Sequence, residues 1–68
     1  IYINGEILAR SEAKVSVFDS GFLLGDGVWE GIRLHNGQLV FCEEHIDRLY
    51  TGAAAIGMDI GMPRNDLV

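Results

Sequence analysis

The chain has 68 residues, a formal net charge of −5 and only five basic residues. This charge argues against a nucleic-acid partner, because neutralising phosphates needs a basic patch. The 49% hydrophobic content is typical of a folded segment rather than a disordered one. No apolar run approaches the ~20 residues of a membrane span, so a membrane partner is not expected either.

The two ends and the single cysteine bear on the context of the chain. The sequence begins on Ile1, without an initiator methionine, and closes on Leu67-Val68 just as a new apolar pattern starts. We therefore expect a fragment of something larger. Cys42 has no partner for an internal disulfide, which fits a reducing, cytoplasmic compartment.

Two Asn-Gly pairs predict two β-hairpins, because the tight turn between paired strands needs positive φ at both central residues. The first pair, Asn4-Gly5, lies within the stretch Tyr2 to Leu8. The second, Asn36-Gly37, joins an alternating strand over residues 28–35 to a partner strand over residues 38–41.

The chain between the hairpins predicts irregular structure. Lys14 to Phe18 alternates weakly and indicates a short extended segment, while Gly21 to Gly27 reads as a tight bend around three apolar residues. Asp19 and Asp26 flank this bend. We expect them to cap or turn the backbone rather than to form an acid/base pair.

A helix is predicted over Glu43 to Met58, where one apolar stripe repeats at helical spacing. The stripe comprises Ile46, Leu49, Tyr50, Ala53, Ile56 and Gly57. Gly57 or Gly61 is expected to stop the helix. A second helix is expected to start within Pro63 to Asp66, with Asn65 as its N-cap. The fold class is therefore α+β, with hairpins forming part of an antiparallel sheet and the helix packed on it.

Residues 28–35 offer the first candidate site. Alternation places Val28, Glu30, Ile32 and Leu34 on one face and Trp29, Gly31, Arg33 and His35 on the other. Arg33 could grip a carboxylate with its planar fork, although a solvated strand face explains it more simply. Gly31 either lets a ligand approach the backbone or marks a bulge or a close helix contact.

Arg48 on the predicted helix is the second candidate. Its spacing from Glu44 favours a surface ion pair, and the sharper alternative is a clamp for a phosphate or carboxylate. The two histidines, His35 and His45, lack companions at metal-ligand spacing, so no metal site is predicted. Cys42 is expected to be a structural thiol.

The motifs together resemble the start of class IV aminotransferases, the fold-type IV pyridoxal-phosphate enzymes. The resemblance rests on an Asn-Gly-Glu hairpin, the run Asp19-Ser-Gly-Phe-Leu-Leu-Gly-Asp-Gly-Val-Trp-Glu-Gly-Ile-Arg33, Asn36-Gly, and Glu44-His-Ile-Asp-Arg48-Leu. It covers residues 2 to 67 or so, and these motifs keep their order and spacing.

The resemblance implies roles for four residues. Arg48 would hold the phosphate of the cofactor, pyridoxal 5′-phosphate. Trp29 and Gly31 would line the substrate pocket, and Arg33 would lie near it and help to bind a substrate carboxylate. The family usually has Phe or Tyr where Trp29 stands, so the bulkier ring would shrink or reshape the pocket.

The same resemblance places the catalytic lysine elsewhere. The Schiff-base lysine belongs to the family's large domain, and Lys14, the only lysine here, does not match it. Residues 1–68 would thus be a partial N-terminal small domain, inactive alone, of a homodimeric enzyme that transfers an amino group from an amino acid to a 2-oxo acid. Branched-chain substrates are favoured. D-amino acid aminotransferase, aminodeoxychorismate lyase and a non-catalytic binding module are the alternatives.

Overall fold

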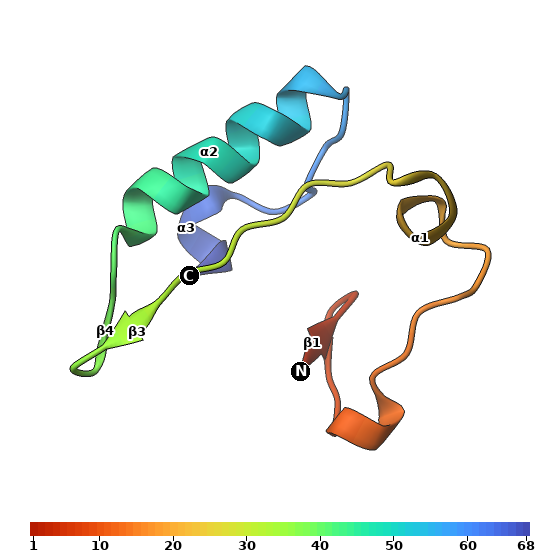
Figure 1. The fold of residues 1–68 in the computed structure, drawn as a ribbon, viewed down its shortest axis with the longest axis horizontal. Helices are drawn as coiled ribbons and strands as arrows, with labels where there is room; N and C mark the ends of the chain where they lie inside the picture. The colour runs from red at the N-terminus through yellow and green to blue at the C-terminus, as the bar shows by residue number, and fades with distance from the viewer.

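The structure, a computed structural model, describes all 68 residues. Two separate two-stranded antiparallel sheets and one long helix make up most of its regular structure. The α+β class is confirmed. The two hairpins do not share a sheet, however, and Figure 1 shows them apart in space, β1 in red and β3 and β4 in green.

Both predicted hairpins form. Strand β1 (Tyr2–Ile3) pairs with β2 (Glu6–Ile7), and β3 (Leu34–His35) pairs with β4 (Gln38–Leu39). The turn residues Asn4, Gly5, Asn36 and Gly37 all have positive φ, from 49 to 90°. This is the backbone that a type I′ turn requires.

The stretch between the hairpins differs from expectation. A 3-10 turn, η1 (Arg10–Glu12), follows the first hairpin, and residues 14–18 form no strand. The expected glycine bend begins instead as a short helix, α1 (Ser20–Leu24). Asp19 caps it by accepting a hydrogen bond from the Phe22 amide at 3.2 Å, as predicted for Asp19. Gly25 then ends it at φ 70°, a value that glycine adopts readily.

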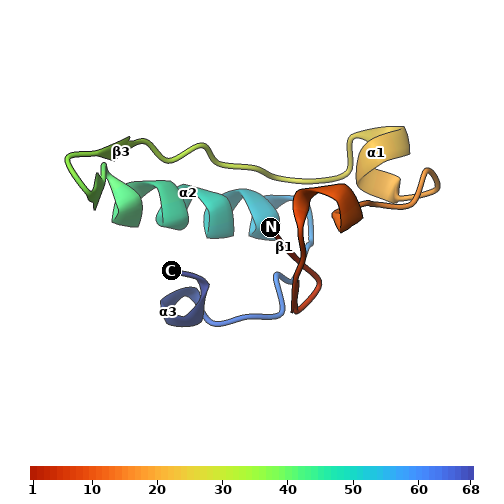
Figure 2. The same cartoon turned by 90° about the horizontal axis from the view of Figure 1, so that it is seen from below.

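The strand predicted over residues 28–35 is paired only at its end, in β3. Residues 28–33, here called the wall segment, have no regular secondary structure. Figure 2 shows them running alongside α2 (Cys42–Ala55). Alternation nevertheless holds in burial: Val28, Glu30 and Ile32 are half-buried, and the residues between them are exposed. The pattern therefore reports packing against a helix rather than membership of a sheet.

Helix α2 forms the centre of the molecule. It begins at Cys42, one residue earlier than predicted, and ends at Ala55, three residues earlier than predicted. The amide of Met58 donates to the Ala53 carbonyl and that of Gly57 to the Ala54 carbonyl, which is the Schellman arrangement. Gly57, at φ 72°, is thus the stop, the first of the two glycines that the sequence offered for this role.

The core is confined to the predicted stripe of α2. Ile46 and Ala53 are the two buried residues of the chain, and Leu49 and Tyr50 are half-buried. In Figure 2, α2 lies between the wall segment and α3 (Arg64–Leu67). The Tyr50 hydroxyl donates to the Met62 carbonyl at 2.6 Å and joins α2 to the segment that precedes α3.

Helix α3 begins earlier than predicted. Its N-cap is Pro63, with no side-chain cap, and Asn65 lies inside the helix. The expectation of Asn65 as the N-cap was therefore wrong. Proline fits the position because its fixed φ suits a helix start and its missing amide is not needed there. No helix of the structure combines the length and apolar character that crossing a membrane requires.

Candidate functional site

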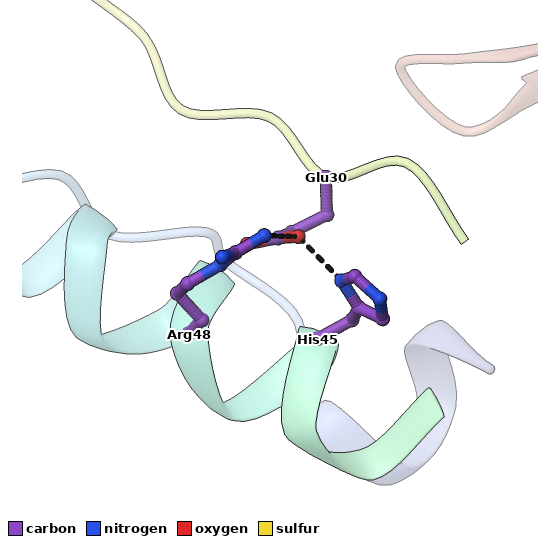
Figure 3. A network of polar contacts seen from close by, with 3 residues as sticks. All are labelled: Glu30, His45 and Arg48. Atoms are coloured by element: carbon purple, nitrogen blue, oxygen red, sulfur yellow. Dashed lines mark hydrogen bonds and ion pairs between the residues drawn. The ribbon is translucent and has the colours of Figure 1, made fainter. Parts of the chain in front are cut away.

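The candidate site is centred on the carboxylate of Glu30, which lies on the inner side of the wall segment. Glu30 accepts hydrogen bonds from Arg48 Nε at Oε1 and from Arg48 Nη2 at Oε2, the latter at 2.6 Å. His45 Nδ1 lies 2.7 Å from Oε2. Figure 3 shows the two helical side chains converging on Glu30 from one side of α2.

The helix places Arg48 and His45 side by side because residues three apart are neighbours on a helix surface. Glu30 reaches them from a segment 15 to 18 residues earlier in the chain. No backbone hydrogen bond joins residues 28–32 to α2 or to either hairpin. The carboxylate and the apolar contacts of the wall segment therefore hold it against the helix.

Burial differs sharply among the three side chains. The Glu30 side chain is 6% exposed and that of His45 25%, whereas that of Arg48 is 72% exposed. A buried carboxylate must be paired or hydrogen-bonded, and Glu30 satisfies this through the fork of Arg48. The hydrogen bonds from Arg48 and then His45 lower the pKa of Glu30 to about 2, so the carboxylate is ionised at neutral pH.

The predicted ion pair between Glu44 and Arg48 does not form. Arg48 and His45 are both bound to Glu30, and Asp47 of α2 pairs with Arg64 of α3. The physical reason is geometry: a bidentate pair with a carboxylate held nearby is favoured over an exposed pair within a helix, which is worth little. Arg48 therefore pairs with an acid of the wall segment and not with one of its own helix.

A hollow of about 350 Å³ beside this cluster is lined by residues of the wall segment and α2, namely Val28, Trp29, Glu30, Arg48, Leu49 and Gly52. A methyl group added at Gly52 would lie 3.4 Å from Val28 Cγ1. The missing side chain at Gly52 thus lets the wall segment approach the helix closely.

The residues predicted from sequence are only partly brought together. Trp29 and Arg48 line the same hollow. Gly31 is next to the indole, since a Cβ built on it would lie 3.7 Å from Trp29 Cζ3. Arg33 does not line this hollow, and its side chain makes no ion pair. Its backbone carbonyl accepts from the Val40 amide at the base of the second hairpin.

Sequence reasoning missed Glu30 and His45. The signal for Glu30 was present, because an acid between Val28 and Ile32 on an otherwise apolar face needs a buried partner. His45 gave no comparable signal, since its role depends on where Glu30 lies. Across the chain, no group of three or more His, Cys, Asp and Glu side chains is arranged to hold a metal ion.

Three relatives match the chain by sequence over most or all of its length. The chain is 47% identical over all 68 residues to a putative branched-chain-amino-acid aminotransferase of Methanocaldococcus jannaschii. It is 45% identical over 67 residues to a D-alanine aminotransferase of Bacillus licheniformis. Across its whole length the chain is thus homologous to the N-terminal quarter of class IV aminotransferases. No family model matches it.

The matches cover nearly all of this chain but little of each relative. The chain spans about a quarter of the curated relatives it matches, 24% of both proteins above. It is also 50% identical over 58 residues, 85% of its length, to branched-chain-amino-acid aminotransferase-like protein 1 of Arabidopsis thaliana, of which it covers 10%. The similarity to these relatives therefore includes the region that contains Glu30, His45 and Arg48.

Proposed function

We propose that the chain is the N-terminal part of a pyridoxal-phosphate-dependent aminotransferase, of which it supplies one pocket wall and a phosphate clamp. The observation that carries the proposal is the 40 to 50% identity to aminotransferases across the chain. When bound, the cofactor would supply an electron sink for the carbon that loses or gains the amino group. The part played by residues 1–68 is binding and orientation.

The residues of this chain fit a phosphate group at Arg48. A guanidinium has five N–H donors, and Glu30 occupies two of those on Arg48. The others are accessible, since the side chain is 72% exposed. A doubly charged phosphate ester suits such a planar set of donors.

Trp29 and Gly31 would form the wall that faces the substrate. Trp29 is 85% exposed, and a large, exposed aromatic side chain beside a hollow is a candidate for ligand contact. Arg33 is a weaker candidate for the substrate carboxylate, because it lies outside the hollow of Trp29 and Arg48. Homodimer formation, a cytoplasmic location and the partial small domain stay predictions.

The substrate class is the finer part of the proposal. We favour branched-chain amino acids, on the Glu-Gly-Ile-Arg pattern of residues 30–33, with D-amino acids second. Relatives of both kinds match the chain at similar identity. A pocket wall narrowed by the indole of Trp29 would discriminate by side-chain size more than by charge.

The test uses the full-length protein encoded by the complete reading frame. Purified with pyridoxal phosphate, it should transfer the amino group of leucine, isoleucine or valine to 2-oxoglutarate, with D-alanine as the competing donor. Preference for D-alanine would replace the branched-chain assignment and keep the reaction. Absence of transfer from any amino acid, in a protein that binds the cofactor, would contradict the proposed function.

A second arm addresses the wall. Trp29→Phe should widen the pocket and change the relative kcat/KM of valine and leucine, with little change for the cofactor. Leu34→Ala provides a matched control, because Leu34 is an exposed residue of the second hairpin that does not line the hollow. Equal effects of the two substitutions would remove Trp29 from the proposed wall.

A further inference from the structure

We infer that Glu30 is a positioning residue for the anion site at Arg48. Its carboxylate holds the Nε and Nη2 edge of the guanidinium and leaves the remaining donors to a phosphate monoester. This inference rests on the proposed function, which it deepens by adding a residue that does not itself touch the ligand. The resemblance to aminotransferases assigned the phosphate of the cofactor to Arg48 alone.

Burial differs sharply between the bonded side chains of Glu30 and Arg48. Glu30 is almost covered, and Arg48 is open to solvent on its other side. A side chain that is anchored at one edge and exposed at the other can bind a ligand without leaving its anchor. Glu30, with acceptor bonds to both Arg48 and His45, has no exposed edge to offer and serves as the anchor.

The contact with Glu30 also limits the conformational entropy that Arg48 would lose when it binds a ligand. A free arginine on a helix surface samples many rotamers, and fixing it at the moment of binding weakens binding. The bidentate contact to Glu30 removes this freedom in advance. Arg48 also has an acid at helical ion-pair spacing, Glu44. Without Glu30, that acid would draw the guanidinium along the helix and away from the wall segment.

The negative charge of Glu30 acts in the opposite direction, since a carboxylate repels a phosphate. Two features limit this effect. The exposed side of Arg48 admits water, which screens charges across the guanidinium. His45 contacts the same carboxylate oxygen as Arg48 Nη2, so part of the carboxylate charge is directed away from the ligand. We therefore expect positioning to outweigh repulsion.

The contact between Glu30 and Arg48 fixes both the guanidinium and the wall segment that carries Trp29. The wall segment has no backbone hydrogen bonds to α2, and Glu30 lies between Trp29 and Gly31 in sequence. Fixing Glu30 on Arg48 therefore also fixes where the indole lies relative to the guanidinium. The register of the pocket wall against the phosphate clamp follows from this one carboxylate.

The experiment compares pyridoxal phosphate with pyridoxal, which lacks the phosphate, in the full-length protein freed of cofactor. The readout is the ratio of the two dissociation constants from absorbance titration. Glu30→Gln should reduce the preference for the phosphorylated form about tenfold and change pyridoxal affinity little. A merely structural role would weaken both ligands alike and leave the ratio unchanged.

Three further variants separate the outcomes. Glu30→Asp keeps the charge but shortens the reach, so a fall in the ratio there shows positioning rather than charge; it also replaces Glu30→Gln if that variant does not fold. Glu44→Gln removes a nearby unpaired acid and should leave the ratio unchanged or slightly raised. Arg48→Gln should abolish the preference for phosphate.

An unchanged or raised ratio in both Glu30 variants, with the preference lost in Arg48→Gln, would overturn the role of Glu30 and leave the proposed clamp intact. A preference kept in Arg48→Gln would instead contradict the clamp itself. The failure of the inference is thereby distinguishable from the failure of the proposed function.

Discussion

Residues 1–27 and residues 28–68 are held together in different ways. Every hydrogen bond in the first region is local, such as the pairing of β1 with β2 or the cap of Asp19 on α1, and the region contains no buried residue. The second region contains both buried residues and all three ion pairs. No hydrogen bond or ion pair joins the two regions.

This difference shows what short motifs can and cannot do. Turn and cap residues specify local shape wherever they occur, so the first region is defined without a core. The second region adds contacts between distant segments, and these contacts create a site. All the proposed binding residues of this chain lie in that second region, where the wall segment runs beside α2 (Figures 1 and 2).

The largest effect is expected from removing the core. Ile46→Ala deletes most of a side chain that is 6% exposed, and such changes lose about 2–5 kcal/mol. A chain of this size has little stability to lose, so the variant should lose helical signal at a lower urea concentration than the original sequence when both are followed by circular dichroism. The matched control, Ile7→Ala in the first hairpin at 84% exposure, should change stability by less than about 0.5 kcal/mol. Equal losses of stability in Ile46→Ala and Ile7→Ala would contradict the view that only the second region depends on a buried core.

Acid should separate the wall segment from α2. The pKa of Glu30 is lowered from 4.5 to about 2. Between these pH values the folded chain therefore binds fewer protons at Glu30 than the unfolded chain does. Its stabilisation is complete above pH 4.5 and is lost as the pH falls towards 2. Fluorescence of Trp29, the single tryptophan, should report the change in that window.

The control for the acid titration is Glu30→Gln, which cannot ionise. Its Trp29 fluorescence should show no transition of this kind between pH 4.5 and 2. A transition of equal size in the variant would mean that other groups hold the wall segment. Residues 1–27 should be insensitive to the substitution at any pH, because no hydrogen bond or ion pair joins them to Glu30.

A smaller and purely local effect is expected from the cap of α1. Asp19→Ala removes the acceptor of the Phe22 amide, and losing such a cap typically costs about 1 kcal/mol. Amide exchange of Phe22 should accelerate about fivefold. Amides of α2 should be unaffected. A change in α2 would reveal coupling between the two regions that does not depend on a hydrogen bond or ion pair between them.

The smallest effect is expected from the pair of Asp47 and Arg64. Both side chains are about half exposed, and exposed pairs contribute about 0–1 kcal/mol. Asp47→Asn should therefore shift urea unfolding slightly at low salt and not at all at high salt. A large loss would show that α3 depends on this pair rather than on the bond from Tyr50 to Met62.

How much the sequence could reveal follows the same division. The Asn-Gly turns, the cap at Asp19 and the stop at Gly57 were predicted because each is chemistry of a few adjacent residues. The pairing of residues 28–33 was not, because alternation fits a helix neighbour as well as a sheet. Arg48 was first assigned to Glu44 for a similar reason: spacing along one helix is visible in sequence, and Glu30 at a distance of 18 residues is not.

The central claim is that this chain binds and positions while the covalent step uses a lysine outside residues 1–68. Borohydride reduction of the full-length protein with bound pyridoxal phosphate, followed by peptide mapping, tests it most directly. The account predicts one labelled lysine, in a peptide that follows Val68, and none at Lys14. A label on Lys14, or no labelled lysine at all, would contradict it.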